Sequence, residues 1–396
     1  MNKEKKLLVL SIIVIIVVSG FILYNLSQKT PVWQKIYKGP DNETGHSVIN
    51  AFKGGYLALG NKEISGDTDV YLIRVNALGN QTWETTLGGP GDDYGYSLRQ
   101  SLARKYIFVG KTSSYGAGGY DAWFVNVEED GTPSFNVTYG GSGDDAAYSF
   151  KQTKDSRYII TGKTSSFGSV LGDVYLLKVN PNGVMQWQKS FGGPGTDWGK
   201  SVLQSENANY WVLGSTNSYG YGGYDFYLVE TNPEGSLVLS KTFGGTGDDF
   251  GDTIVENIDG SFILTGKTNS SGKGSFDALI IKIDSYGNQT WNKTFGGSGN
   301  ESATFSRETN DRGFLIIGDT TSYGAGGSDI FVLKTDYEGN VEWNKTFGGP
   351  GNDYASFILE TFDRGYLLIG TTIPPKNGTR DIMMIKMDLN GNTVPL

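Results

Sequence analysis

The sequence has no cysteine and only one histidine, His46. Without cysteine the chain can form neither disulfides nor a thiolate nucleophile, and it has no cysteine ligands for zinc or iron. A chain without cysteine can still be exported, because disulfides are permitted outside the cytoplasm but are not required there. Catalysis that depends on several histidines is also excluded.

Acidic residues outnumber basic ones, and no basic stripe follows the first six positions. The chain carries 33 Lys and Arg against 42 Asp and Glu, a net charge of -9, and a pI near 4.8. Binding to a phosphate backbone needs a basic stripe, and no such stripe is present. We therefore expect no nucleic-acid partner.

Runs of helix-favouring residues are also few, whereas glycine and aromatic residues are abundant. The chain has Gly 58 against Pro 11, 23 tyrosines, and an aromatic content of 13%. Short β-branched and aromatic segments separated by glycine turns are typical of all-β proteins. The composition predicts many short strands.

The N-terminus carries a targeting signal. Residues 1–6 form a basic flank, and residues 7–25 form an apolar segment that is long enough to span a bilayer. We expect a retained transmembrane signal-anchor, a linker over residues 26–31, and everything beyond it outside a cell membrane. The alternative is secretion after signal cleavage. Sequons at ten positions predict a glycoprotein, namely Asn25, Asn42, Asn80, Asn136, Asn269, Asn288, Asn292, Asn300, Asn344 and Asn377.

A strict internal period is the strongest feature of the rest of the chain. Aspartate recurs every 52 residues at Asp69, Asp121, Asp173, Asp225, Asp277, Asp329 and Asp381. A glycine column and an aromatic column follow the same period, except that two residues are missing between Gly60 and Asp69. The sequence therefore predicts seven units, one of which has a shortened loop.

Each unit contains four extended segments. In the unit from Tyr94 these are YGYSLRQS, KYIFVGKT, DAWFVNV and PSFNVTYGG. Seven such units predict a monomeric seven-bladed β-propeller over residues 32–396, and the runner-up is a β-solenoid. The last unit lacks its fourth strand, and residues 32–37 are a fourth strand without a unit. We expect residues 32–37 to pair with residues 381–387 and close the ring.

The unit also resembles a known family of repeats. The pattern W-N-K-T-F-G-G-x-G-x-D, followed by an aromatic with G-x-T and then D-x-x-x-x-K-x-D-x-x-G-N, is similar to the tandem propeller repeats of archaeal and bacterial cell-surface proteins. The resemblance covers residues 32–396. It implies a secreted or membrane-tethered propeller, and it carries no common activity or catalytic residues.

The glycine-rich loop that opens each unit has three possible chemical roles. A phosphate loop should lead into a helix and lack carboxylates, and TFGGTGDDFG at residues 242–251 meets neither condition. The second hypothesis is a calcium site, the only cofactor that the sequence suggests, at Asp93, Asp145, Asp197, Asp249 and Asp353. The third is a structural turn repeated in every unit, together with the Asp69 column.

Function is expected where the repeat varies. Two variable positions fall where the first strand of each unit begins, at the mouth of the predicted channel. Their aromatic and charged members are the candidate ligand-binding residues: Tyr94, Tyr96, Tyr148, Trp198, Lys200, Phe250, Asp252 and Tyr354.

These residues indicate a binding or scaffold module for a protein, peptide or glycan. The alternatives are a glycosidase-like hydrolase with a carboxylate pair at the channel mouth, and a calcium-binding surface protein. No catalytic residue can be assigned from the sequence. The arginine cluster that a sialidase-like site needs is not expected, because Arg99 and Arg307 lie four units apart.

Overall fold

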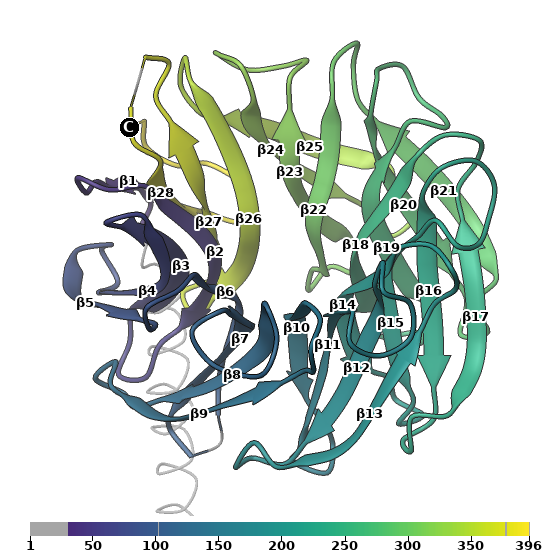
Figure 1. Cartoon of the computed structure of the whole chain (residues 1–396). Coiled ribbons are helices and arrows are strands. Elements are labelled where there is room, and N and C mark those ends of the chain that lie inside the picture. The colour runs from purple at the N-terminus through teal and green to yellow at the C-terminus, as the bar shows by residue number, and fades with distance from the viewer. Residues whose placement is uncertain (1–30, 102, 377, 396) are drawn as a thin grey trace, which may run out of the picture.

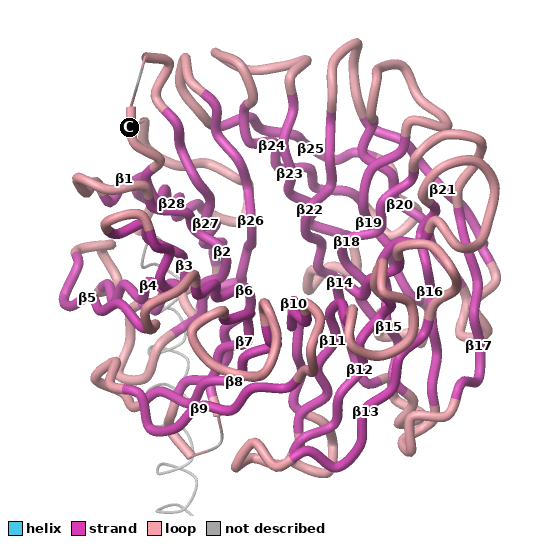
Figure 2. Tube along the Cα trace, viewed as in Figure 1, coloured by secondary structure: helices cyan, strands magenta, loops and turns pink. Residues whose placement is uncertain are grey.

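The computed structural model describes residues 31–396 except 102, 377 and 396. This part of the chain forms 28 strands and no helix, and Figure 2 shows strands throughout the ring. No helix long and apolar enough to cross a membrane occurs among the described residues. The predicted basic flank, signal-anchor and most of the linker lie outside the described residues, as do Asn25 and Asn377.

The strands form seven four-stranded antiparallel sheets arranged as the blades of a propeller (Figure 1). The innermost strands are β2 (Glu43–Asn50), β6 (Asp93–Gln100), β10 (Asp145–Gln152), β14 (Asp197–Gln204), β18 (Asp249–Glu256), β22 (Glu301–Glu308) and β26 (Asn352–Thr361). The second strands are β3 (Tyr56–Ile64), β7 (Tyr106–Thr112), β11 (Tyr158–Thr164), β15 (Tyr210–Thr216), β19 (Phe262–Thr268), β23 (Phe314–Thr320) and β27 (Gly365–Ile373).

The third strands are β4 (Asp67–Val75), β8 (Asp121–Val127), β12 (Asp173–Val179), β16 (Asp225–Thr231), β20 (Asp277–Ile283), β24 (Asp329–Thr335) and β28 (Asp381–Met387). The outer strands are β5 (Gln81–Leu87), β9 (Pro133–Tyr139), β13 (Met185–Phe191), β17 (Leu237–Phe243), β21 (Gln289–Phe295), β25 (Val341–Phe347) and β1 (Trp33–Tyr37). The predicted seven-bladed, four-stranded propeller is confirmed.

The seventh blade is closed by the beginning of the domain. β1 pairs antiparallel with β28, from Trp33 opposite Lys386 to Tyr37 opposite Ile382. Trp33 is 7% exposed, and its indole N–H donates to the carbonyl oxygen of Ala77 at 3.1 Å. The predicted closure is therefore confirmed, and β1 covers the outer edge of β28.

The first blade has the shortened loop that the spacing predicts. β3 and β4 are nine residues each, whereas their counterparts in the next five blades have seven, and they meet in a turn at Ser65 and Gly66 with positive φ. The two missing residues thus shorten the loop, while both strands extend into it. A two-residue turn replaces the glycine-rich loop because the strands continue their pairing to Ile64 and Asp67.

The hydrophobic core lies between blades and not within them. Seven buried clusters occur among the described residues, and each joins neighbouring blades. The cluster around Ile382 and Met384, for example, packs the seventh blade on Val48, Tyr56 and Tyr71 of the first. Stacking of both faces of each sheet holds the ring rigidly and fixes the direction of the inner strands.

Candidate functional site in the central channel

One residue bulges from each inner strand. The pairing of inner and second strands skips a position in all seven blades, for example between Gly95 and Ser97. A bulge inserts an unpaired residue and redirects its side chain. The skipped residues are His46, Tyr96, Tyr148, Lys200, Asp252, Thr304 and Ser356.

These seven bulge residues, which we call the channel ring, all line one cavity of about 290 Å³ on the propeller axis. The inner strands surround this axis in Figure 1. Of the predicted binding residues, the ring contains Tyr96, Tyr148, Lys200 and Asp252. The sequence located this variable position but gave no sign of the bulge.

The aromatic members of the channel ring contact one another. The ring of Tyr96 packs edge-on against His46 at 5.8 Å between centroids and against Tyr148 at 5.3 Å. The ammonium of Lys200 lies 5.1 Å from the centre of the Tyr148 ring. His46 also shares a hydrogen bond with the Thr44 hydroxyl, 3.1 Å from its Nε2. One half of the channel wall is therefore aromatic with polar edges.

The pKa values of two members of the channel ring, His46 and Asp252, are shifted in the direction that burial dictates. Burial lowers the pKa of His46 to about 4, with a further contribution from the charge of Lys200. Burial raises the pKa of Asp252 to about 6, although Lys200 and Lys267 oppose the rise. The channel thus holds a neutral imidazole and a carboxyl group that titrates near pH 6.

A second carboxyl group, Asp319 on β23, lies close enough for the charge of Asp252 to affect its pKa. Burial raises the pKa of Asp319 to about 7, with a further rise from the charge of Asp252. Asp319 accepts the main-chain N–H of Ala355 at 2.7 Å and the Ser302 hydroxyl at 3.2 Å.

Its position in the repeat gives Asp319 a structural role. Equivalent side chains accept the corresponding N–H of the next blade at three other junctions, through Asn61, Ser215 and Thr371. The carboxyl pair therefore combines one free group, Asp252, with one group used in blade packing.

The other predicted aromatics lie outside the channel cavity. Tyr94 stacks on Tyr96 at 6.3 Å and lies 6.2 Å from Tyr120. Trp198 and Phe250 are 6.2 Å apart, and both pack on Tyr224 at 5.1 Å. Tyr354 is 38% exposed. These half-buried rings extend the aromatic surface from the channel ring onto the surrounding loops.

The acidic columns meet at the blade junctions. Gly88 lies between Asp69 of the first blade and Asp93 of the second, because a Cβ there would meet an oxygen of each. Burial raises the pKa of Asp69, and the charge of Asp93 raises it further. The same arrangement joins Asp121 with Asp145, Asp173 with Asp197, Asp225 with Asp249, Asp277 with Glu301, and Asp329 with Asp353.

In most of these pairs the carboxylates accept hydrogen bonds from a neighbouring loop. Asp93 accepts the N–H of Gly89 at 2.7 Å and the Ser114 hydroxyl at 2.6 Å, and Asp121 accepts the N–H groups of Ala117 and Gly118. The turn role of both columns is thus visible in the hydrogen bonds. The other oxygen is buried without a hydrogen bond in Asp69, Asp93, Asp145, Asp173, Asp197, Asp249 and Asp381.

No group of three or more potential metal ligands occurs in the part of the chain that the structure describes. An ion at a junction would have two carboxylates and backbone carbonyl oxygens. At the junction of the seventh and first blades a lysine already supplies a cation, since Lys62 Nζ lies 3.1 Å from Glu43. The calcium hypothesis for Asp93, Asp145, Asp197, Asp249 and Asp353 stays a prediction.

The channel continues beyond the ring into a second cavity of about 430 Å³. Arg99, Lys151 and Arg307 all line it. The expectation that Arg99 and Arg307 are too far apart in the sequence to act together is wrong, because closure of the ring brings their strands to the same axis. Positions along the chain alone could not reveal this.

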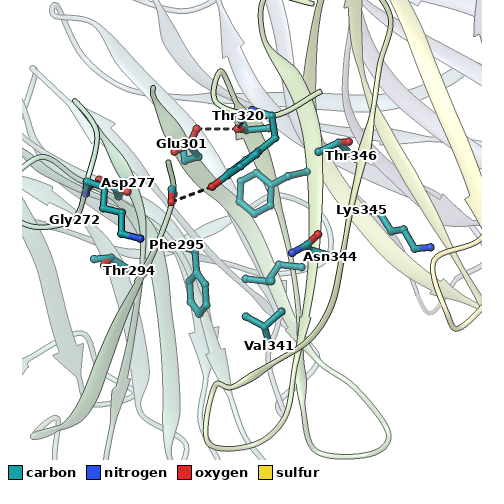
Figure 3. Close-up of a pocket in the computed structure, with 15 residues that line it drawn as sticks. Gly272, Asp277, Thr294, Phe295, Glu301, Thr320, Val341, Asn344, Lys345 and Thr346 are labelled. Atoms are coloured by element: carbon teal, nitrogen blue, oxygen red, sulfur yellow. Dashed lines mark hydrogen bonds between the residues drawn. The ribbon is translucent and has the colours of Figure 1, made fainter. Parts of the chain in front are cut away.

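A larger cavity of about 750 Å³ lies away from the axis, between the outer parts of the fifth and sixth blades (Figure 3). Phe295 and Val341 supply apolar wall, and Thr320 donates to Glu301 at its inner end. The exposed sequon Asn344 also lines this cavity. It contains none of the predicted binding residues.

Comparison with known proteins defines the class of fold and no more. No protein family matches the chain, and no curated protein resembles it in sequence. Among solved structures, a polysaccharide lyase is similar at TM-score 0.51 and 12% identity over 92% of this chain and 93% of the other.

A puromycin hydrolase is similar at the same TM-score and identity, over 89% of this chain and 54% of the other. The propeller domain of a protease from Pyrococcus furiosus aligns at TM-score 0.45 and 10% identity, over 87% and 93% of the two chains. At such identities the likeness extends to the propeller fold alone.

Proposed function

We propose that this protein is a binding module that holds a short polar segment of a glycan, peptide or protein at the channel ring. One observation carries the proposal: seven bulged side chains, the variable positions of an otherwise regular repeat, converge on one cavity. Tyrosine rings offer stacking surfaces, and Asp252, Lys200, Thr304 and Ser356 offer hydrogen bonds. A volume of about 290 Å³ suits one sugar residue or one side chain.

Glycan and peptide arrays probed with the full chain test the proposal. Tyr148→Ala and Lys200→Ala should weaken binding to whichever array responds, because both side chains line the channel. Tyr286→Ala is the matched control, since Tyr286 is 77% exposed in a turn between outer strands. Binding that survives both channel substitutions would contradict a site at the ring.

A hydrolase is the second candidate, and the raised pKa values of Asp252 and Asp319 favour it. A carboxyl group that titrates near neutral pH is suited to general acid or base catalysis. The propeller fold also occurs in a lyase and a hydrolase. If the site is hydrolytic, Asp252→Asn should abolish turnover of an array ligand and preserve its binding. If the unsubstituted protein does not turn over any array ligand, the hydrolase candidate is wrong and the binding role remains.

We further propose that residues 7–25 anchor the propeller outside a cell membrane. The support is the apolar run with its basic flank. Expressed in a bacterial or archaeal host, the full chain should fractionate with membranes, and a chain that begins at residue 26 should not. The propeller should be accessible to protease added outside intact cells.

A calcium role is proposed for the blade junctions, where buried carboxylate oxygens lack hydrogen-bond donors. Two carboxylates with carbonyl oxygens make a weak site, so stabilisation should require millimolar and not micromolar calcium. Thermal unfolding with calcium and with magnesium at equal ionic strength measures it. An unchanged melting temperature at millimolar calcium would remove this role.

A further inference from the structure

Three cations occupy equivalent positions on the inner strands, three residues after the bulge. Arg99 on β6, Lys151 on β10 and Arg307 on β22 stand where the other four blades have Ile49, Leu203, Val255 and Leu359. All three line the second channel cavity of about 430 Å³. The repeat itself therefore does not require a charge at this level of the channel, because aliphatic side chains serve in the majority of blades.

The surrounding carboxylates compensate little of this charge. Arg307 has one ion pair, with Glu360, at 3.6 Å. Arg99 donates from Nε to the main-chain oxygen of Phe150 at 3.0 Å. Lys151 makes no hydrogen bond and no ion pair with any residue that the structure describes.

The remaining acidic groups at this level are engaged elsewhere. Glu256 lines the cavity and accepts the N–H of Glu206 at 3.0 Å. Glu308 follows Arg307 and accepts the N–H of Ile258 at 3.1 Å. Neither carboxylate forms an ion pair with Arg99, Lys151 or Arg307, so the contact of Arg307 with Glu360 is the one ion pair of the three cations among the described residues.

Part of the wall around these cations is apolar. Phe305 and Phe357 line the cavity with their rings 4.3 Å apart, and Leu203, Ile254 and Val255 lie beside them. All three cations are half-buried, so their attraction for an anion is less screened than that of a fully exposed side chain. The side-chain amides of Gln152 and Gln204 and the Ser306 hydroxyl add neutral donors.

The three cations repel one another. The charge of Arg99, together with burial and the charge of Arg307, holds the pKa of Lys151 well below its ordinary value. Burial lowers the pKa of Arg99 to about 10. Such an arrangement destabilises the protein unless something negative occupies the cavity.

We propose that Arg99, Lys151 and Arg307 form a binding site for a tetrahedral dianion, a phosphate or sulfate group that is either free or carried by a small ester. Three cationic side chains on one cavity attract a dianion more strongly than a monoanion. Guanidinium groups bind two oxygens of such an anion at once, and the lysine ammonium binds a third. Arg99 and Lys151 line the channel-ring cavity as well, so the two sites adjoin. The anion site does not depend on the ligand proposed for the channel ring, because Arg307 and its ion pair with Glu360 lie on the side of the second cavity.

Calorimetric titration of the full chain with inorganic phosphate, sulfate and methyl phosphate tests the site, with chloride replacing each anion at constant ionic strength. Phosphate or sulfate should bind and raise the melting temperature. Equal binding of methyl phosphate would indicate an ester, and its exclusion a free ion. Failure of all three anions to bind at millimolar concentration would overturn the proposal.

Substitutions of Lys151 distinguish an anion-binding role of this side chain from a packing role. Lys151→Met should weaken phosphate binding by about 10-fold or more, as loss of one charge-assisted hydrogen bond does, and should raise the melting temperature without anion. Lys151→Arg should retain binding. Lys189→Met, at an exposed position on β13, removes the same charge and should change neither property. Unchanged affinity in Lys151→Met would overturn the proposal.

Discussion

At the scale of the residue, one inserted position per blade determines what the channel presents. The regular positions of each inner strand are fixed by packing, since Asp93, Gly95 and Leu98 are buried against neighbouring strands and blades. The bulge residue is free of these constraints because it is left out of the pairing. Chemistry can therefore change at Tyr96 or Asp252 without disturbing the repeat.

Asp252 should make the stability of the protein depend on pH. Its folded-state pKa of about 6 exceeds the ordinary value of 3.8, so its contribution is favourable below about pH 4 and is lost as the pH rises through 6. Asp252→Asn should therefore raise the melting temperature at pH 8 and have little effect at pH 4.

Thermal unfolding across this pH range measures the difference. Glu234→Gln, an exposed carboxylate on a loop, is the control and should shift neither end of the range. A destabilisation by Asp252→Asn at pH 8 would show that the ionised carboxylate, with Lys200 and Lys267, stabilises the fold.

At the scale of the element, the strands and turns of each blade can be predicted from the sequence. Which side chains approach one another on the channel axis cannot. Alternating segments bounded by glycine and aspartate give the strands to within one or two residues, because period and turn chemistry agree. Residues 32–37 form a fourth strand without a unit, and the last unit lacks a fourth strand. Together they predict how the ring closes.

Three features of the channel could not be predicted from one sequence. The bulge has no signature at Tyr96 or Lys200, since any residue type occupies it. The approach of Asp319 to Asp252 depends on the distance between neighbouring blades. The convergence of Arg99 and Arg307 depends on closure of the whole ring.

The junction carboxylates should be structural in every blade. Asp249 is fully buried and accepts the N–H of Gly245 at 2.8 Å and the Ser270 hydroxyl at 2.6 Å. Asp249→Ala should reduce the free energy of unfolding by about 2–3 kcal/mol, because both donors lose a charged acceptor. Chemical denaturation measures the change.

Two matched variants provide reference values for the change in the free energy of unfolding caused by Asp249→Ala. Ser270→Ala removes one of the two donors and should cost about 1 kcal/mol. Glu234→Ala alters an exposed position and should stay within about 0.5 kcal/mol. Equal stability of all three variants would show that the turn does not depend on the aspartate.

At the scale of the whole molecule, stability depends on closure of the ring. Each hydrophobic cluster is shared by neighbouring blades, so an open ring would expose one entire cluster. β1 covers the outer edge of β28 and places Trp33 against Tyr56 of the first blade, with 6.4 Å between ring centroids. β1 therefore stabilises both the seventh blade and its junction with the first blade.

A chain that begins at residue 38 should be less stable and should self-associate. It loses β1 and leaves the backbone groups of β28 unpaired, which invites pairing with another copy. Trp33→Ala keeps the strand and should cost about 3–5 kcal/mol as a large-to-small change in a buried site.

Light scattering and thermal unfolding distinguish these effects. The shortened chain should show both a larger mass and a lower melting temperature, whereas Trp33→Ala should remain monomeric. A shortened chain that stays monomeric and equally stable would show that closure by β1 is dispensable.

Closure by β1 also imposes an order in time. A ribosome makes β1 before any other strand of the ring and makes β28 last, so the first strand to emerge has no place to dock until synthesis is nearly complete. Blades between them can fold as they appear, because their contacts are local. The final step pairs β1, which is made first, with β28, which is made last. A chain that lacks β28 cannot take this step.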